Sequence, residues 1–255
     1  MQLYIDPLQM EKIQDSLPSF YKIKVFDSLN STNEWLACHP NELEGTVILA
    51  DGQTGGKGRN GRSFYSPRGN GIYLSLLLKP PGDIQSILHY TALCAVSICE
   101  AIEEVYGLCP SIKWLNDIHY HEKKLGGILC EGKLQGKQFE SLILGMGINV
   151  HSFILPDDIV STAASIEDFI PIKKPRNELI TRFLQHFYSY YHDQRPFIQP
   201  YKSRLAYVNR KIWICSSHKK ELATLLGVDE SFRLIVQKED GAIDVLSSGE
   251  ISIRL

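Results

Sequence analysis

The chain has 255 residues, of which 44% are hydrophobic and 22% are charged, and its formal net charge is −2. This is the composition of an ordinary globular protein with room for one sizeable core and a small second domain. The near-neutral charge balance excludes a global field that would draw the protein to nucleic acid or to a membrane.

The start of the chain lacks the long apolar region of a signal peptide, and no run approaches the roughly 18 apolar residues that span a bilayer. We therefore expect a cytoplasmic protein that does not cross a membrane. The six cysteines lie in apolar contexts without a Cys-x-x-Cys pair, which predicts reduced core residues and no metal centre. They are Cys38, Cys94, Cys99, Cys109, Cys130 and Cys215.

Apolar periodicity predicts alternating strands and helices in the first part of the chain. Ser31 and Glu34 have the spacing of a capping box and predict a helix start. Gly107, followed by Pro110, predicts the end of a long amphipathic helix. The predicted elements are a strand at 21–26, a helix from 31 to about 39, strands at 45–50 and 71–79, and a helix at 84–106.

The second part of the chain predicts a strand meander, two helices and a run of short strands. The meander strands are 111–114, 117–120, 125–131 and 139–146, the loop 151–164 follows, and the helices are 177–191 and 198–204. The later strands are 211–215, 221–227, 232–237, 242–246 and 250–254. These patterns predict an α+β protein with a mixed sheet in domain 1–205 and a small SH3-like β-barrel in domain 206–255.

Residues 51–62 form a loop with five glycines and the cations Lys57, Arg59 and Arg62. Glycines let backbone amides approach a ligand, and the cations suit a phosphate or a carboxylate. The plain structural alternative is a solvated hairpin tip with ordinary surface charges. The glycine content and the lack of an apolar anchor predict a loop that its own contacts do not order, and that closes over a bound anion.

Four further stretches carry polar groups that could bind a ligand. Ser31-Thr32-Asn33 lies at a helix start, where capping alone is the alternative interpretation. Lys113 and Asp117 can face a cleft together or form an ordinary surface ion pair. Glycines at 126–127 and 145–147 can leave room for a ligand or mark a bulged strand. His119 and His121 have a low prior for binding a metal.

Taken in this order, the stretches resemble the motifs of the biotin–protein ligase family. The family pattern is Ser-Thr-Asn, Gln with a Gly-Arg-Gly-Arg-type loop, Ser-Pro-x-Gly, Leu-Ser, Lys-Trp-Pro-Asn-Asp, Lys-(Leu/Ile)-(Ala/Gly)-Gly-Ile-Leu and Gly-x-Gly-Ile-Asn. This chain matches it at 31–33, 53, 56–62, 66–69, 74–75, 113–117, 124–129 and 145–149. The resemblance spans about residues 26–150, and residues 249–255 also look like the family's C-terminal domain.

The sequence departs from the family pattern at several places. Leu115 replaces the usual proline, Lys57 stands where many members have arginine, and Phe64 stands where some have an adenine-stacking tryptophan. About twenty residues before the first strand cannot hold a helix-turn-helix. The operator-binding role of two-domain members is therefore not expected here.

The resemblance implies a class II synthetase-like catalytic fold and an ATP-dependent biotin–protein ligase. Biotin, ATP and Mg²⁺ would give biotinyl-5′-AMP and pyrophosphate, and a lysine of a biotin carboxyl carrier domain would then receive biotin. The alternatives are a lipoate or octanoate ligase of the same fold and a nucleic-acid-binding module without enzymatic activity. The sequence leaves open whether the protein is a monomer or a homodimer.

The same resemblance assigns roles to residues of this chain. Lys124, Arg59, Lys113 and Asp117 would be catalytic, with Mg²⁺ held mainly by the ATP phosphates and Asp117 as its one candidate protein ligand. Biotin would be bound by Ser31, Thr32, Asn33, Gln53, Gly56, Lys57, Gly58, Arg59, Lys124, Gly127, Gly145 and Gly147. ATP would be bound by Lys57, Arg59, Arg62, Phe64, Lys113, Asn116, Lys124 and Asn149.

Overall fold

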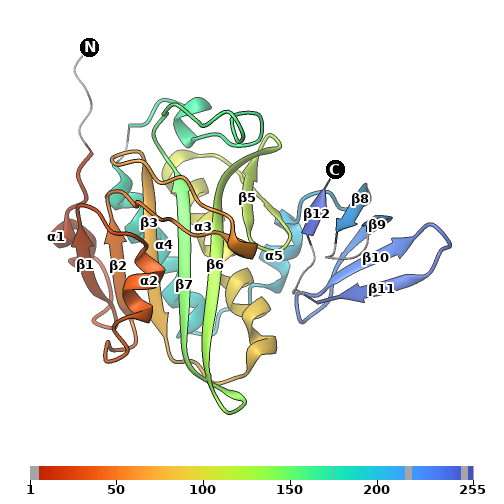
Figure 1. The fold of residues 1–255 in the computed structure, drawn as a ribbon, viewed down its shortest axis with the longest axis horizontal. Helices are drawn as coiled ribbons and strands as arrows, with labels where there is room; N and C mark the ends of the chain where they lie inside the picture. Colours follow the sequence, from red (N-terminus) through yellow and green to blue (C-terminus); the bar gives the residue numbers. More distant parts are fainter. Residues whose placement is uncertain (1–5, 174, 216–219, 248–251, 255) are drawn as a thin grey trace.

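The structure is a computed structural model that describes residues 6–173, 175–215, 220–247 and 252–254. A seven-stranded mixed sheet dominates it, and a five-stranded antiparallel sheet follows (Figure 1). We call residues 6–205 the N-terminal unit and the described residues from 206 on the C-terminal unit. The first sheet contains β1 (Lys22–Phe26), β2 (Thr46–Ala50), β3 (Gly71–Leu78), β4 (Ser111–Lys113), β5 (Asp117–Tyr120), β6 (Lys123–Gln135) and β7 (Gln138–Asn149).

The strand order of the large sheet is β1-β2-β3-β7-β6-β5-β4. β1 and β2 are parallel, and the other neighbouring pairs are antiparallel. Every residue of β3 is buried, because the strand is central and both faces of the sheet are covered. This explains why its sequence is a continuous apolar run rather than an alternation. The predicted meander is confirmed, with β6 and β7 longer at both ends than the sequence indicated.

Helices cover the two faces of this sheet unequally (Figure 1). α3 (Ile87–Tyr106) and α4 (Arg176–Tyr191) pack on one face and enclose the main core. The short α2 (Thr32–Ala37) packs on the other face, over a small cluster that includes Leu36, Ile48 and Leu77. The remaining helices are α1 (Met10–Gln14), which the sequence did not predict, and α5 (Ile198–Arg204). The face that carries only α2 stays open enough for a cavity.

The stretch Ile84–Tyr106 is long and apolar enough to cross a membrane by length and composition, and it is the one such helix among the described residues. Its most apolar window is 67% buried inside the protein. The core therefore accounts for its hydrophobicity. Its end follows the sequence signal, since Gly107 adopts the left-handed conformation (φ +70°) beyond the last turn.

The C-terminal unit contains β8 (Lys211–Cys215), β9 (Lys220–Val228), β10 (Leu234–Lys238), β11 (Ile243–Leu246) and β12 (Ser252–Arg254). Their order is β11-β10-β9-β8-β12, all antiparallel. The start of the predicted strand 250–254 and most of the family-like tail 249–255 lie outside the described residues. The α+β class with a second, antiparallel sheet is thus confirmed, and the boundary at residues 205–206 stays a prediction.

The cysteines do not all follow the sequence prediction. Cys94 and Cys99 are buried, as expected, and burial raises the pKa of the Cys99 thiol to about 12. Cys38 and Cys109 are exposed, so the expectation of six core cysteines was wrong. Cys38 directly follows α2 and Cys109 lies in the loop between α3 and β4, where an apolar sequence context does not imply burial.

A buried arginine joins distant parts of the N-terminal unit. Arg176 is 1% exposed and begins α4. Its guanidinium lies 2.8 Å from the carboxylate of Asp51 and donates to the carbonyl of Gly71 at 2.7 Å. Asp6 accepts from the Arg176 backbone amide at 2.8 Å and from His151 at 3.0 Å. Arg176 therefore fixes the first residue of the glycine-rich loop to the start of β3.

We predict that Arg176→Met lowers the free energy of unfolding by about 3–5 kcal/mol, because it leaves two carboxylates without their buried cation. Urea denaturation followed by circular dichroism measures this change. The matched control is Lys133→Ala, whose exposed partner is Glu140, and it should cost less than about 1 kcal/mol. Equal effects of the two substitutions would contradict the role of Arg176.

Candidate active site

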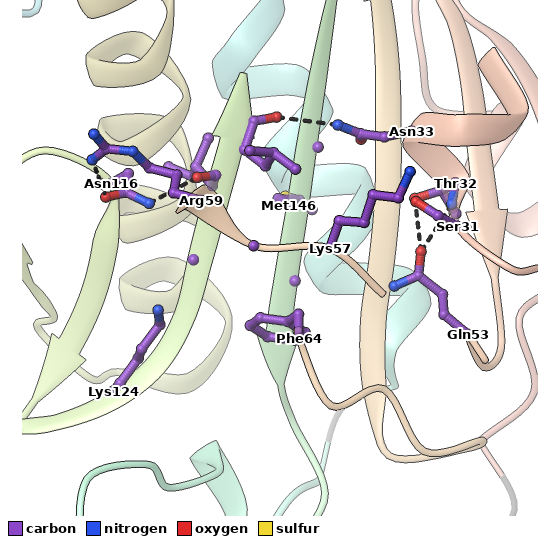
Figure 2. A pocket seen from close by; sticks show the side chains of 16 residues that line it. Ser31, Thr32, Asn33, Gln53, Lys57, Arg59, Phe64, Asn116, Lys124 and Met146 are labelled. Carbon is purple, nitrogen blue, oxygen red and sulfur yellow. Dashed lines mark hydrogen bonds between the residues drawn. The ribbon is translucent and has the colours of Figure 1, made fainter. Parts of the chain in front are cut away.

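A cavity opens on the sheet face that carries α2 (Figure 2). It is lined by the start of α2, the glycine-rich loop, the turn between β4 and β5, and the middle of β6 and β7. These segments are distant in sequence and meet only in the folded sheet. The predicted site residues that line it are Ser31, Thr32, Asn33, Gln53, Lys57, Gly58, Arg59, Phe64, Asn116, Lys124, Gly127, Gly145 and Gly147.

One end of the cavity is a network of neutral polar groups. The Gln53 side-chain oxygen accepts from the Thr32 backbone amide at 2.8 Å and lies 3.2 Å from the Thr32 hydroxyl. The Gln53 amide nitrogen donates to Ser66 at 3.0 Å, and Ser75 lies 2.7 Å from the Thr32 hydroxyl. Ser31 caps α2 by accepting from the Glu34 amide at 3.4 Å. The helix start is therefore both capped and turned towards the cavity, so capping and ligand binding are compatible here.

The floor of the cavity consists of glycines on two adjacent strands. Gly127 pairs with Gly147 across β6 and β7, and Gly145 is two residues before Gly147. A Cβ at Gly145 would lie 2.1 Å from Asn33 Oδ1, and one at Gly147 would lie 2.5 Å from the Phe64 ring. The missing side chains thus make room for the protein's own Asn33 and Phe64, which reach over the strands.

The other end of the cavity is cationic. Lys124 Nζ lies 2.7 Å from Asp117 Oδ1 and next to the bare backbone of Gly127. Arg59 donates to Asn116 Oδ1 at 3.0 Å. Burial lowers the pKa of Arg59, and the neighbouring Asp117 opposes this shift. Two cations held by neutral or singly charged partners leave this end able to receive an anion.

Backbone hydrogen bonds inside and outside the stretch 51–62 hold the glycine-rich loop, and its closure over a bound anion stays a prediction. Gly55 donates to the Asn30 carbonyl at 2.8 Å, and Gly58 donates to the Arg62 carbonyl at 2.7 Å. Phe64 closes the hairpin with a bond to Gly56 at 2.9 Å and provides the apolar anchor just beyond the stretch 51–62. Lys57 points towards α2, where its Nζ lies 3.9 Å from Glu34 (Figure 2). The loop cations therefore reach different ends of the cavity.

Five predicted residues do not line the cavity. Gly56 is packed against the Phe64 carbonyl, and exposed Arg62 lines a neighbouring depression beside Phe64. Lys113 and Asp117 are paired across β4 and β5, and the Asp117 carboxylate forms an ion pair with Lys124. Asn149 is buried and donates to the Ala164 carbonyl at 3.0 Å. Asn149 and Asp117 thus contact other residues of the protein and do not line the cavity.

Comparison with known proteins identifies the family. Residues 25–149 match the biotin/lipoate A/B protein ligase family. The bifunctional ligase/repressor BirA of Bacillus subtilis is 37% identical over 66% of this chain and 52% of its own length. That of Bacillus spizizenii is 32% identical over 88% of this chain and 71% of its own length. This chain belongs to the biotin/lipoate protein ligase family.

A solved relative shows the same fold as this ligase. The biotin protein ligase of Aquifex aeolicus, in complex with biotin and ATP, has a TM-score of 0.78 and 28% identity. The match covers 92% of this chain and 99% of that one. The family resemblance and the fold class implied by the sequence motifs are thereby confirmed.

Sequence reasoning assigned no binding role to several residues that shape the ligase cavity, although Ser66 and Ser75 lie in the matched motifs. Ser66 and Ser75 complete the polar network around Gln53, and Glu131 accepts from Asn33 at 2.6 Å. Ser75 had a signal, since it is the one hydroxyl in the apolar core of β3 besides the phenol of Tyr73. Glu131 and Arg176 had no local signal, because their partners lie about a hundred residues away.

His119 is a buried titratable group beside the cationic end. It is 6% exposed, lies two residues after Asp117 on β5, and pairs with Lys124 across the sheet. Burial lowers its pKa from 6.5 to about 4, with Lys113 and Lys124 acting in the same direction and Asp117 opposing them. The imidazole is therefore neutral in the folded ligase at neutral pH.

We predict a pH-dependent contribution of His119 to stability. Its pKa is lower in the folded than in the unfolded state, so the unfolded chain binds an extra proton between pH 6.5 and pH 4. Stability is therefore retained above pH 6.5 and lost as the pH falls towards 4. His119→Phe should remove on the order of 2–4 kcal/mol of this loss, measured by urea titrations at several pH values. If the free energy of unfolding of the wild type and of His119→Phe changed in parallel with pH, this role of His119 would be refuted.

Proposed function

We propose that this protein is an ATP-dependent biotin–protein ligase. It forms biotinyl-5′-AMP and pyrophosphate, and then transfers biotin to a lysine of a biotin carboxyl carrier domain. The observation that carries this proposal is that hydroxyl and amide groups gather at one end of the cavity, beside Lys57, while Lys124 and Arg59 lie at the other end (Figure 2). The complex of a family member with biotin and ATP supports the pair of substrates.

The neutral end suits the ureido ring of biotin. Ser31, Thr32 and Gln53 present hydroxyl and amide groups that can accept from its N–H groups and donate to its carbonyl. Asn33, Gly145 and Gly147 shape the adjoining floor. A ring without charge needs such neutral partners, because a cation buried against it would gain little and lose its hydration.

The cationic end suits the first chemical step. The biotin carboxylate must approach the α-phosphate of ATP, and two unit charges about 4 Å apart repel by roughly 4 kcal/mol at an effective dielectric near 20. Lys124 lies where it can bridge the carboxylate and the α-phosphate, and Asp117 orients it. Arg59 adds a second positive charge from the loop. Preorganised cations that meet the charge of the transition state lower its energy.

The ATP side of the site extends from Arg59 towards Asn116 and Phe64. Phe64 offers an aromatic surface for the base, and Arg62 and Lys57 can meet the outer phosphates if the loop tip moves. The described residues contain no group of three or more His, Cys, Asp or Glu side chains that could hold a metal ion. Mg²⁺ therefore fits this site as an ion carried by ATP, where it would neutralise phosphate charge.

In the second step a neutral lysine amine of the carrier domain attacks the acyl carbon of the mixed anhydride. The amide bond forms, the bond to AMP breaks, and the amine loses its proton. Lys124 and Arg59 are positioned to stabilise the departing AMP, which is again an anion.

The proposal predicts pyrophosphate exchange that depends on biotin. Purified protein with biotin and MgATP should exchange labelled pyrophosphate into ATP and then label a carrier domain. Parallel reactions with lipoate and with no acid separate the rival ligase activity from the proposed one. Exchange with lipoate alone, or exchange without any acid, would overturn the proposal.

We also predict that Lys124→Ala lowers adenylation on the order of a hundredfold, because one preorganised charge at the transition state is lost. Lys123→Ala is the matched control, since the Lys123 amine bonds to the carbonyl of Ser161 outside the cavity. Adenylation should be measured with circular dichroism as a check of folding. Equal losses in both variants would show that Lys124 is not the central cation.

A further inference from the structure

A turn of the C-terminal unit, residues 229–233, has an unusual backbone. Phe232 has φ +60°, the left-handed region that glycine normally occupies. Asp229 fixes the turn, since its Oδ1 accepts the backbone amides of Ser231 and Arg233 at 2.9 Å each. A bulky residue persists in this conformation only when the surroundings hold it there.

The surroundings that hold Phe232 belong to the N-terminal unit. Its side chain is 3% exposed and stacks on Phe197 with the ring centroids 5.2 Å apart and an angle of 9°. Tyr201 meets it edge-on at 5.2 Å, and His89 lies 5.9 Å away. The ring is therefore seated in an aromatic socket built by α3, α5 and the residue that precedes α5.

The backbone of Phe232 contacts a residue of the site motif. Trp114 donates its indole N–H to the Phe232 carbonyl at 2.9 Å, and the bond is buried. A carbonyl left without its donor in such a place costs more than an exposed one. With this left-handed backbone, the ring and the carbonyl of Phe232 both face the N-terminal unit, so the one conformation makes both contacts.

Trp114 in turn lies two residues before Asn116. Asn116 is fixed to β6 by two bonds of 2.9 Å, one from its side chain to the Ile128 carbonyl and one from the Ile128 amide. The Asn116 side-chain oxygen accepts from Arg59. The segment between β4 and β5 is thus held by β6 on one side and by the C-terminal unit on the other.

We propose that Trp114 and Phe232 are positioning residues through which the C-terminal unit sets the place of Asn116 and Arg59. This inference rests on the proposed function, because Arg59 is assigned there to the cationic end, where the phosphates of ATP would bind. At the neutral end, Thr32 and Gln53 bond to each other and to Ser75 and Ser66, which are not members of this chain of residues. Loss of the link therefore weakens ATP use and leaves biotin binding unchanged.

Three variants test this link. Trp114→Phe keeps most of the buried ring but removes the indole donor. Phe232→Gly keeps the carbonyl and accepts the left-handed backbone, but it removes the ring from the socket. Ser231→Ala changes the neighbouring turn residue, whose bond to Asp229 uses the backbone amide, and is the matched control.

Biotin affinity is measured by calorimetry, and kcat and KM for ATP by pyrophosphate exchange at saturating biotin. Trp114→Phe should lower kcat/KM for ATP about ten- to a hundredfold, since displacement of a catalytic group by ~1 Å has effects of that size. Biotin affinity should stay within about twofold. Phe232→Gly should lower kcat/KM for ATP in the same way, and Ser231→Ala should match the wild type. An unchanged kcat/KM in Trp114→Phe, or parallel losses of biotin and ATP binding, would overturn the inference.

Amide exchange in the free protein provides a readout that does not depend on the activity. The Ile128 amide, which donates to Asn116, should exchange faster in Trp114→Phe and Phe232→Gly than in Ser231→Ala. Equal protection in all three would overturn the inference even in an active enzyme. If the wild-type protein showed no biotin-dependent pyrophosphate exchange, the proposed function would be refuted instead. The amide exchange of Ile128 would still decide whether the link exists.

Discussion

The cavity depends on one steric constraint, the absence of side chains on the open face of β6 and β7. Gly127 and Gly147 are paired across the strands, and Gly145 lies beside them. At Gly145 even a methyl group would collide with Asn33, at 2.1 Å. Because nothing projects from these positions, Asn33 and Phe64 can cross the sheet and a ligand can approach the backbone. A floor with ordinary strand residues would close the cavity, whatever polar groups surrounded it.

Charge is then distributed along this floor in a way that the chemistry requires. The end at Gln53 and Thr32 contains hydroxyl and amide groups bonded to one another. The end at Lys124 and Arg59 contains two cations, of which Lys124 contacts Asp117 and Arg59 donates to Asn116. A substrate with an uncharged ring and a reacting carboxylate would be oriented by this difference in charge between the two ends. Such an orientation would bring the carboxylate to the end where Lys124 and Arg59 can offset its repulsion from a phosphate.

Both ends are fixed by residues that lie outside the cavity. Arg176, 1% exposed, anchors the first residue of the glycine-rich loop through Asp51. Trp114 and Phe232 join the cationic end to the C-terminal unit. These contacts are buried, and buried polar groups are held in one geometry because leaving them unpaired is costly. The site is therefore a property of both units and of both faces of the large sheet.

The sequence by itself determined the elements and the chemical character of the site. Apolar periodicity gave the long helix and the meander, and the order of short motifs, from Ser31-Thr32-Asn33 to the glycines at 145–147, indicated the ligase family. These signals are local, since they depend on residues within a few positions of one another. The sequence also suggested a loop that its own contacts do not order, and the bond to Asn30 and the contact with Phe64 that hold it come from outside the stretch 51–62.

Only the tertiary structure decided which residues share the cavity and which support it. It directed Lys57 and Arg59, two residues apart, to different ends, and it placed Asn149 in a structural bond outside the cavity. It also revealed Glu131 and Arg176, whose partners are about a hundred residues away. No local pattern encodes such pairs, because the distance between them is set by how the strands align in the sheet and not by their separation along the chain.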